Sequence, residues 1–350
     1  MYDGIIDLFS DTATRPTPAM RRAMAEAVVG DDHKGEDPTV NWLQEKVADL
    51  LGKEDALYLP SATMGNEIAF KVHTNPGDEI IMERTSHPVH FEGGAPAFLS
   101  GAMIYSVEGR RGIFEPERID EAVRPNDIHF PRSKLVSVEN THNLGGGAIW
   151  PLEKLQAACR RARHYQLGLH LDGARLLNAV VATGISARDY AAPFDSVCLC
   201  LSKGLGAPVG AVLAGSEAFI SEAKWQRLRL GGAMRQAGII AAGGVYALDH
   251  HVPRLAEDHQ HAKILAGGLA EIPGIALNVD EVETNIVFFD VSGLGLTAAE
   301  VVQRLLQCGV RMGALGRTRV RAVTHLDVTR SDIDRAVAVA RETLGKGNRG

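Results

Sequence analysis

Short apolar runs rich in β-branched residues alternate with helical patterns from the N-terminus to about residue 250. The candidate strands lie at 55–60, 78–83, 102–107, 134–140, 167–172, 195–202 and 210–215. Helices are predicted between several of them: Thr17 and Pro18 open a helical pattern that ends at Gly30, and Pro151 opens another over 152–165. Nearly continuous apolar strands separated by helices predict a mostly parallel sheet with both faces covered.

The pattern changes after about residue 250. A long helix is followed by strands at 284–291 and 319–325 and by a final helix at 332–345, which together predict a smaller α+β unit. The chain has no internal repeat and no linker rich in Pro, Gly or Ser. We therefore expect an α/β fold with a large domain over residues 1–250 and a small, closely packed C-terminal α+β domain over residues 251–346, with residues 1–16 contributing to the site of the large domain.

Composition and charge narrow the range of partners. The 350 residues carry a net charge of −6, without the basic excess that favours binding to nucleic acid or to an anionic membrane. The N-terminal residues lack the basic region and the apolar stretch that are typical of a secretory signal peptide. No apolar run reaches the ~18 residues of a membrane span. Four cysteines without a CxxC pair are typical of reduced thiols in a cytosolic core. These features predict a soluble, cytoplasmic protein that binds neither nucleic acid nor membranes.

Polar residues follow four of the candidate strands. They are Asp172, Lys203, the loop at 137–143 and the turn at 60–66. In open α/β sheets, ligands bind beyond the carboxyl ends of the strands, where the connecting loops meet. We therefore expect these four segments to lie at one edge of the sheet and to form one site.

The turn at 60–66 has features of a phosphate site. Ser61 and Thr63, with the small Ala62 between them, fall where a strand gives way to a helix, so that free backbone N–H groups and two hydroxyls suit an anion. Taken alone, the turn is better explained as an ordinary helix N-cap. The sequence contains neither a Walker loop nor a dinucleotide-binding glycine motif after a strand.

Lys203 and Asp172 indicate cofactor chemistry. Lys203 follows an apolar run and precedes the glycines of "GLGAPVG", which allow backbone to approach a ligand closely. A desolvated lysine suits Schiff-base formation, and a carboxylate facing it across a cofactor would pair with a pyridinium nitrogen, as in enzymes that use pyridoxal phosphate (PLP). Individually, a helix-capping Asp172 and a solvated Lys203 are alternatives that the residues leave open.

Two histidines, His87 and His142, are predicted in loops after strands. A flat imidazole can stack on a pyridine ring, and either side chain can accept a proton near neutral pH. Either can equally be an ordinary hydrogen-bonded loop residue, which is the only role that we assign to His90 and His170. No close ligand spacing accompanies the histidines, so we expect no metal site.

Two arginines are candidates for binding a carboxylate. Arg175 comes three residues after Asp172, one helical turn on, so that both side chains can face one site. Arg321 lies on a strand-like segment, where alternation places it on the same face as Arg319. A guanidinium there would hold an amino acid carboxylate bidentately, and a solvated edge strand explains that segment equally well.

Together, these segments resemble the L-threonine aldolases of the β-eliminating-lyase group, which are fold-type I PLP enzymes with an aspartate-aminotransferase-like large domain. The resemblance covers nearly the whole chain, through the motifs "DLFSDTATRPTPAM", "PSATMGN", "HPVHFEGGA", "NDIHFPR", "ENTHN", "LHLDGARLLNA", "CLSKGLGAPVG", "GGAMRQAG" and "VTHLDV". It implies PLP-dependent cleavage of threonine, allo-threonine and related L-3-hydroxy-α-amino acids to glycine and an aldehyde, by a homotetramer built from dimers that share active sites. A β-eliminating lyase, an aminotransferase, a racemase and a non-catalytic PLP-binding protein remain as alternatives.

The resemblance implies a role for each candidate at the cofactor. Lys203 would form the Schiff base, Asp172 would meet the pyridine nitrogen, and His87 would stack on the ring. The residues expected to bind the phosphate are Ser61, Ala62, Thr63 and, from a neighbouring subunit, Arg235.

The resemblance also implies a set of substrate-binding residues. Ser10, Arg175 and Arg321 would bind the substrate carboxylate or the cofactor's phenolic oxygen. His142 would lie near the β-hydroxyl of the substrate. The base that takes the hydroxyl proton would be His87, His142 or a water molecule.

Four positions depart from the pattern of the family. Phe9 replaces the arginine of "DLRSDT", Lys34 stands where a tyrosine is usual, Ala62 replaces a glycine, and Leu228 replaces a common lysine. We expect the cofactor chemistry to survive these changes. We expect the substrate range to differ, because lysine and tyrosine differ in charge and shape and this position lies beside the substrate pocket in the family.

Overall fold

The large sheet contains all seven strands expected before residue 250. The computed structural model describes residues 4–345. In sheet order the strands are β2 (Asp55–Leu59), β8 (Ala211–Gly215), β7 (Ser196–Cys200), β6 (Gly168–Asp172), β5 (Ser133–Glu139), β3 (Glu79–Glu83) and β4 (Met103–Val107). All neighbours from β7 to β4 run parallel, and β8 is antiparallel to both β7 and β2. The predicted α/β fold with a mostly parallel sheet is confirmed.

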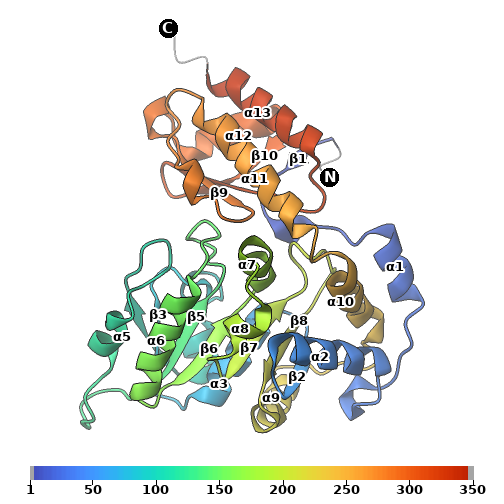
Figure 1. The fold of residues 1–350 in the computed structure, drawn as a ribbon, viewed down its shortest axis with the longest axis vertical. Helices are drawn as coiled ribbons and strands as arrows, with labels where there is room; N and C mark the ends of the chain where they lie inside the picture. Colours follow the sequence, from blue (N-terminus) through green and yellow to red (C-terminus); the bar gives the residue numbers. More distant parts are fainter. Residues whose placement is uncertain (1–3, 346–350) are drawn as a thin grey trace.

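Helices cover the sheet and form much of the smaller part of the molecule (Figure 1). Their bounds are α1 (Pro18–Ala25), α2 (Pro38–Leu51), α3 (Ala62–His73), α4 (His87–His90), α5 (Glu117–Ala122), α6 (Leu152–His164), α7 (Leu176–Thr183), α8 (Ala187–Ala191), α9 (Glu217–Arg229), α10 (Gly238–His250), α11 (Leu255–Ala270), α12 (Ala298–Gln307) and α13 (Arg330–Leu344). Many of these helices start at a side chain that caps free backbone N–H groups, such as Thr17 before α1 and Ser61 before α3.

Each face of the large sheet is buried against its own layer of helices. Along β2, Ala56 and Tyr58 point into a core shared with α2, α6, α7 and α10. Leu57 and Leu59 point the other way, into a core shared with α3 and α9. Because successive strand residues face opposite sides, a strand buried on both sides must be apolar throughout, which is the pattern that the sequence displays.

A second core lies in the smaller part of the molecule, drawn in orange and red in Figure 1. It is formed by α11, α12, α13 and the three-stranded antiparallel sheet β11 (Gly313–Leu315), β12 (Arg319–Val323) and β9 (Ile286–Asp290). The strands expected from the sequence here were β9 and β12. The short strands β11 and β10 (Val310–Arg311) were missed because neither is long enough to show a period.

The N-terminal segment crosses between the two cores. Strand β1 (Ile6–Asp7) pairs in parallel with β10, and both Ile6 and Leu8 are buried in the second core. The chain then runs to the edge of the large sheet, where Ser10 and Asp11 are buried. The domain limits expected at residue 250 stay a prediction, and their outer ends at residues 1 and 346 lie outside the described residues.

The first helix is shorter than the sequence predicts. It ends at Ala25 rather than at Gly30, because the backbone beyond it bonds to the start of α2 instead of continuing the helix. The Val28 carbonyl accepts a hydrogen bond from Thr39 Oγ1 at 2.6 Å, and the Gly30 N–H donates to Asp37 Oδ2 at 3.2 Å. These partners are distant from the helical pattern, so periodicity alone could not reveal them.

The cysteines are free, but they are not all in the core. Cys159, Cys198 and Cys200 are buried, and Cys308 is exposed, so the prediction of core thiols is wrong for Cys308, which follows the end of α12. Among residues 4–345, no helix combines the length and the apolar character needed to cross a lipid bilayer.

Two neighbouring glycines of α11 test how tightly the second core packs. A Cβ atom added at Gly267 meets no atom within 4 Å, whereas one added at Gly268 would lie 2.5 Å from Val337 of α13. Gly267→Ala should stabilise the protein by about 0.5–1 kcal/mol, because alanine favours a helix. Gly268→Ala should destabilise it by about 1–3 kcal/mol through overpacking. Urea unfolding of the apo protein measures both, and equal effects would contradict this packing of α11 on α13.

Candidate active site

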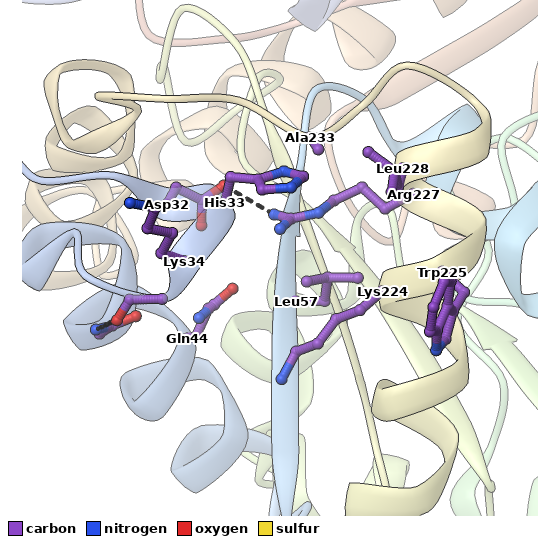
Figure 2. A pocket seen from close by; sticks show the side chains of 12 residues that line it. Asp32, His33, Lys34, Gln44, Leu57, Lys224, Trp225, Arg227, Leu228 and Ala233 are labelled. Atoms are coloured by element: carbon purple, nitrogen blue, oxygen red, sulfur yellow. Dashed lines mark hydrogen bonds and ion pairs between the residues drawn. The ribbon is translucent and has the colours of Figure 1, made fainter.

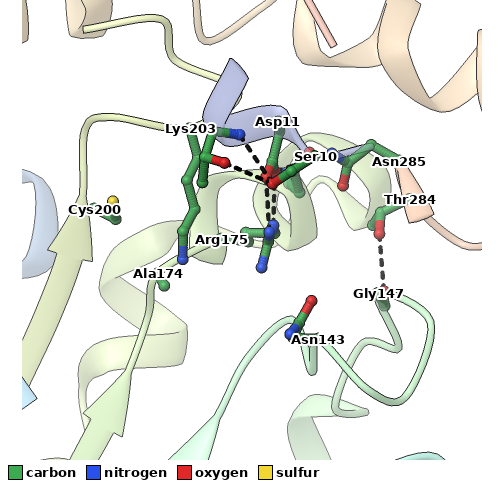
Figure 3. Close-up of polar contacts among 12 residues, drawn as sticks. Ser10, Asp11, Asn143, Gly147, Ala174, Arg175, Cys200, Lys203, Thr284 and Asn285 are labelled. Atoms are coloured by element: carbon green, nitrogen blue, oxygen red, sulfur yellow. Dashed lines mark hydrogen bonds and ion pairs between the residues drawn. The ribbon is translucent and has the colours of Figure 1, made fainter. Parts of the chain in front are cut away.

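The carboxyl ends of the parallel strands bring the expected polar residues to one edge of the sheet. Asp172 is the last residue of β6, opposite Glu139 at the end of β5, and Lys203 follows the end of β7 by three residues. The charges of Asp172 and Lys203 both act on the imidazole of His87. Figure 3 shows Lys203, Arg175 and Asn143 pointing toward the same region.

Lys203 is held through its backbone, and its amine has no partner among residues 4–345. The Lys203 carbonyl accepts hydrogen bonds from Thr14 Oγ1 and from the Gly206 N–H, both at 2.8 Å. Gly206 has a φ of +76°, which a side chain would strain. Among the residues that the structure describes, none forms a hydrogen bond or ion pair with Nζ. The side chain is half-buried, so an amine is available in a partly desolvated position.

Asp172 is a buried carboxylate with both oxygens engaged. It is 3% exposed. Its Oδ1 accepts a hydrogen bond from the Ala174 N–H and its Oδ2 accepts one from Asn66 Nδ2, both at 3.0 Å. A carboxylate with two fixed donors keeps lone pairs for one further donor, such as a protonated ring nitrogen.

His87 lies at the start of α4 and is oriented by a carboxylate. Its Nδ1 lies 2.7 Å from Oε1 of the buried Glu92, and its backbone N–H donates to Glu139 Oε2 at 2.8 Å. Burial alone lowers the pKa of His87, but the bond to Glu92 and the charges of Asp172 and Glu92 outweigh it, so that the pKa is raised. The side chain is 28% exposed, and Nε2 has no partner among the described residues.

His142 is fully buried. Its Nδ1 accepts a hydrogen bond from the Gly145 N–H at 3.1 Å, which leaves the ring proton on Nε2. That nitrogen lies 3.5 Å from Glu83 and 3.7 Å from Glu139, and a Cβ atom at Gly112 would overlap the ring. The expected contact of His142 with a substrate hydroxyl stays a prediction. In this arrangement the imidazole supports the loop at 140–147.

Arg175 forms a buried ion pair with Asp11 (Figure 3). Its Nε and Nη2 donate to the two oxygens of Asp11, both at 2.7 Å, and Asn285 Nδ2 donates to the same carboxylate at 3.2 Å. Burial alone raises the pKa of Asp11, but the Arg175 guanidinium outweighs it and holds the pKa well below its usual range. Residues 173–175 form a turn before α7 rather than the helical turn expected, because Arg175 is drawn toward Asp11.

Arg321 and Ser10 lie at the same edge. Arg321 donates to Asn143 Oδ1 at 3.1 Å and to the Phe9 carbonyl at 3.2 Å. Burial lowers its pKa, as does the charge of Arg175, so the two guanidiniums are close enough to repel and would gain from a shared anion. Ser10 caps the short 3-10 helix Asp11–Ala13, with its Oγ accepting from the Thr12 N–H and hydroxyl.

The segment expected to hold phosphate is a helix N-terminus. Ser61 is the N-cap of α3, where its Oγ accepts from the Met64 N–H at 3.2 Å. The N–H groups of Ala62 and Thr63 stand in the first turn, which has no intrahelical acceptors. Both interpretations of the turn, a cap and an anion site, are compatible with this geometry.

Among the described residues, no hydrogen bond or ion pair joins Lys34 or Arg235 to Lys203, Asp172 or His87. Lys34 lines a cavity of about 410 Å³ with other basic side chains, including Lys224 and Arg227 (Figure 2). None of the residues around Lys203 lines it. Arg235 pairs with Asp31 at 3.0 Å and its side chain is 63% exposed. Leu228, another departure from the family pattern, also lines the cavity.

Sequence reasoning missed several residues that hold this site together. They are Asp11, Asn66, Glu92, Asn143 and Asn285. All except Asn285 fall inside the motifs quoted above, so their position in those motifs was a usable signal. Among residues 4–345, no group of three or more His, Cys, Asp or Glu side chains is arranged to bind a metal ion.

Comparisons with known proteins give the site a context. The family model described as "Beta-eliminating lyase" matches residues 7–292. The chain is 40% identical over 344 residues to low-specificity L-threonine aldolase 1 of Arabidopsis thaliana, covering 97% of this chain and 96% of that protein. It is also 40% identical to the low specificity L-threonine aldolase of Escherichia coli, covering 98% of this chain and 100% of that one.

A solved structure agrees with the fold. The threonine aldolase of Leishmania major superimposes with a TM-score of 0.84 over 97% of this chain and 99% of that chain, at 21% identity. At that identity the likeness concerns the fold alone.

Replacing Asp11 by Asn tests the buried ion pair. Arg175 would keep its charge without a neutralising partner, so we expect the free energy of unfolding at pH 7 to fall by about 3–5 kcal/mol. Asp334→Asn, which breaks an exposed pair with Arg330, is the control and should cost less than about 1 kcal/mol. Urea unfolding of the apo protein measures both losses.

The pair also predicts a pH dependence. Because the pKa of Asp11 is lower in the folded than in the unfolded protein, its contribution is complete above about pH 4 and is lost as the pH falls toward the folded-state pKa. The stability difference between wild type and Asp11→Asn should therefore shrink on acidification. A difference that stays constant down to acid pH would contradict the pairing.

Proposed function

The chain belongs to the β-eliminating lyase family, among the low-specificity L-threonine aldolases, and from this we propose that it cleaves L-threonine, L-allo-threonine and related L-3-hydroxy-α-amino acids to glycine and an aldehyde, with PLP as cofactor. The enzyme is a lyase. The observation that carries the proposal is the amine of Lys203, which has no partner among the described residues, together with the buried carboxylate of Asp172 at the carboxyl edge of the sheet.

The residues at this edge fit PLP by the chemistry of their donor and acceptor groups. The free N–H groups and hydroxyls of Ser61, Ala62 and Thr63 would hold the phosphate at the start of α3. Asp172 would accept a hydrogen bond from the ring nitrogen, and Lys203 would bond covalently to the aldehyde carbon. When bound, the conjugated ring takes up the electron pair released as the Cα–Cβ bond of the substrate breaks.

Two guanidiniums would bind the substrate carboxylate. Arg175 uses Nε and Nη2 on Asp11 and has donors left on Nη1 and Nη2. Arg321 is positioned by Asn143 and by the Phe9 carbonyl. Because the two guanidinium groups repel each other in a poorly solvated position, binding of a carboxylate between them would be favoured. Ser10 is proposed as a further hydrogen-bonding group at this place.

His87 is the better candidate for the base that takes the β-hydroxyl proton. Its Nδ1 is bound to Glu92, so its Nε2 is the nitrogen free to accept a proton. A raised pKa makes the imidazole a stronger base near neutral pH. His142 has no exposed surface and would need the loop at 140–147 to move, so we propose it chiefly as a support of that loop.

A neighbouring subunit would complete the site. We propose a homotetramer in which Arg235 and Lys34 act at the site of an adjacent chain, since among the described residues neither bonds to Lys203, Asp172 or His87 in its own chain. Arg235 would contribute to phosphate binding and Lys34 to the choice of substrate. We also propose that the enzyme acts in the cytoplasm, where its four free cysteines would stay reduced.

The reaction and its lysine can be tested together. Purified enzyme with PLP and L-threonine should yield glycine and an aldehyde, and Lys203→Ala should abolish this activity and the cofactor–protein bond that borohydride traps. Peptide mapping locates the bond, with Lys134 and Lys34 as internal controls. A keto acid or a racemised amino acid as product would favour an aminotransferase or a racemase. No turnover on a panel of β-hydroxy amino acids would favour a non-catalytic PLP-binding protein.

Shared sites predict complementation between two defective variants. Arg235→Ala should weaken cofactor binding by about 1.5–3 kcal/mol, the usual loss for a hydrogen bond to a charged group, and Lys203→Ala should be inactive. Coexpressed subunits of the two variants should regain part of the wild-type activity, because some sites combine an intact Lys203 with an intact Arg235. A mixture no more active than the average of the two parents would place Arg235 outside the neighbour's site.

A further inference from the structure

A row of polar side chains, formed by the buried Asn66, His170 and Ser196 and the half-buried His73, runs through the protein behind Asp172. Asn66 Oδ1 lies 3.1 Å from His170 Nε2, and His170 Nδ1 lies 2.9 Å from Ser196 Oγ. Ser196 Oγ in turn lies 2.8 Å from His73 Nε2. The row thus links the second turn and the last residue of α3 with the neighbouring strands β6 and β7.

Asn66 is the member that meets the site. Its Nδ2 lies 3.0 Å from Asp172 Oδ2 and 2.9 Å from Glu92 Oε1, and Asn66 is 1% exposed. The same Glu92 oxygen lies 2.7 Å from His87 Nδ1. The amide nitrogen of Asn66 therefore bonds to two carboxyl groups. One is Asp172, the proposed partner of the cofactor's ring nitrogen, and the other is Glu92, which orients His87.

The hydrogen bonds of this row can run in only one direction. Both carboxylates need a donor, so the amide nitrogen of Asn66 faces them and its oxygen faces His170. His170 must then carry its proton on Nε2. Its Nδ1 accepts from the Ser196 hydroxyl, whose oxygen accepts from His73.

Burial keeps both histidines of the row neutral. It lowers the pKa of His170 to about 3, with a further decrease from the nearby His73. It also lowers the pKa of His73 to about 4. A neutral imidazole carries one N–H, so each ring donates once and accepts at most once, and no member of the row can deliver a charge to Asp172.

The carboxyl groups of Glu67 and Glu92 form a neighbouring buried pair that agrees with this assignment of donors and acceptors. Glu67 is buried next to Glu92, and burial together with the charge of Glu92 raises the pKa of Glu67. Burial therefore favours the neutral form of Glu67, and Oε1 of Glu92 is the oxygen that Asn66 and His87 share.

We propose that Asn66 is a positioning residue for the cofactor, and that His170, Ser196 and His73 lock its amide so that it always presents its N–H groups to Asp172 and Glu92. The amide then fixes the position of Asp172 as an acceptor for a protonated ring nitrogen and fixes His87 through Glu92. A flipped amide would place its oxygen against two carboxylates, which is unfavourable in a buried site. The part of the proposal that concerns the ring nitrogen rests on the proposed function. The assignment of donors and acceptors along the row is independent of that function.

The first test uses the apo protein. Solid-state ¹⁵N spectra of histidine-labelled apo protein at pH 7 should show His170 neutral and protonated on Nε2, and His170→Phe identifies its resonance. A proton on Nδ1, or a doubly protonated ring, would overturn the proposal. The measurement is made on the wild-type protein, and His170→Phe serves only to assign the resonance. Its outcome is independent of whether the enzyme cleaves threonine.

The second test uses bound PLP labelled with ¹⁵N in its ring. In the wild type the ring nitrogen should be protonated. Asn66→Leu, which has a similar shape but no donor, and His170→Phe should both move its resonance toward that of an unprotonated pyridine. They should also weaken PLP binding about tenfold to a hundredfold, the usual effect of losing a hydrogen bond to a charged group.

A matched control separates this role from ordinary core packing. His259 Nε2 lies 2.9 Å from Asn178 Oδ1 in another buried pair, between α11 and α7. His259→Phe should destabilise the fold without moving the ring-nitrogen resonance or PLP affinity. The proposal is overturned if Asn66→Leu and His170→Phe bind PLP with an unchanged ring resonance, or if His259→Phe moves the resonance equally. Failure of the wild type to bind PLP would instead count against the proposed function.

Discussion

The buried ion pair between Asp11 and Arg175 connects the parts of the chain that make the site. Asp11 comes from the segment that leaves the second core after Leu8, and Arg175 comes from the turn after β6. Asn285, which immediately precedes β9, adds a third hydrogen bond. Two charges removed from water are tolerated only where they satisfy each other. The position of the Arg175 guanidinium beside Lys203 therefore depends on how the N-terminal segment crosses between the two cores.

The loop at 140–147 is held by contacts from both parts of the molecule. Gly112 packs so closely over His142 that a side chain there would overlap the imidazole, and Gly147 is packed in the same way against Thr284. The Thr284 hydroxyl also donates to the Gly147 carbonyl at 2.9 Å (Figure 3). Asn143 and its partner Arg321 are thereby positioned both by the turn at 110–113, which contains Gly112, and by Thr284, which lies just before β9.

Histidines on this edge of the sheet and in the row behind it have different pKa shifts according to their partners. His73 and His170 face only neutral groups directly, and desolvation lowers the pKa of each. His87 is half-buried, but the bond to Glu92 and the nearby charge of Asp172 outweigh desolvation and raise its pKa. The same side chain is thus a fixed hydrogen-bonding link behind the carboxylate of Asp172 and a proton acceptor in front of it.

The sequence by itself determined the order of strands and helices, the covered parallel sheet, and the placement of Asp172 and Lys203 beyond the ends of their strands. These properties follow from local periodicity and from turn residues, which act over a few positions. The tertiary structure alone decided that Arg175 pairs with Asp11, 164 residues away, that His142 is buried beneath Gly112, and that His170 bonds to Asn66, 104 residues away. Such contacts depend on which segments meet in three dimensions. No pattern within either segment encodes its partner, because each side chain is compatible with several environments until burial and hydrogen bonding select one.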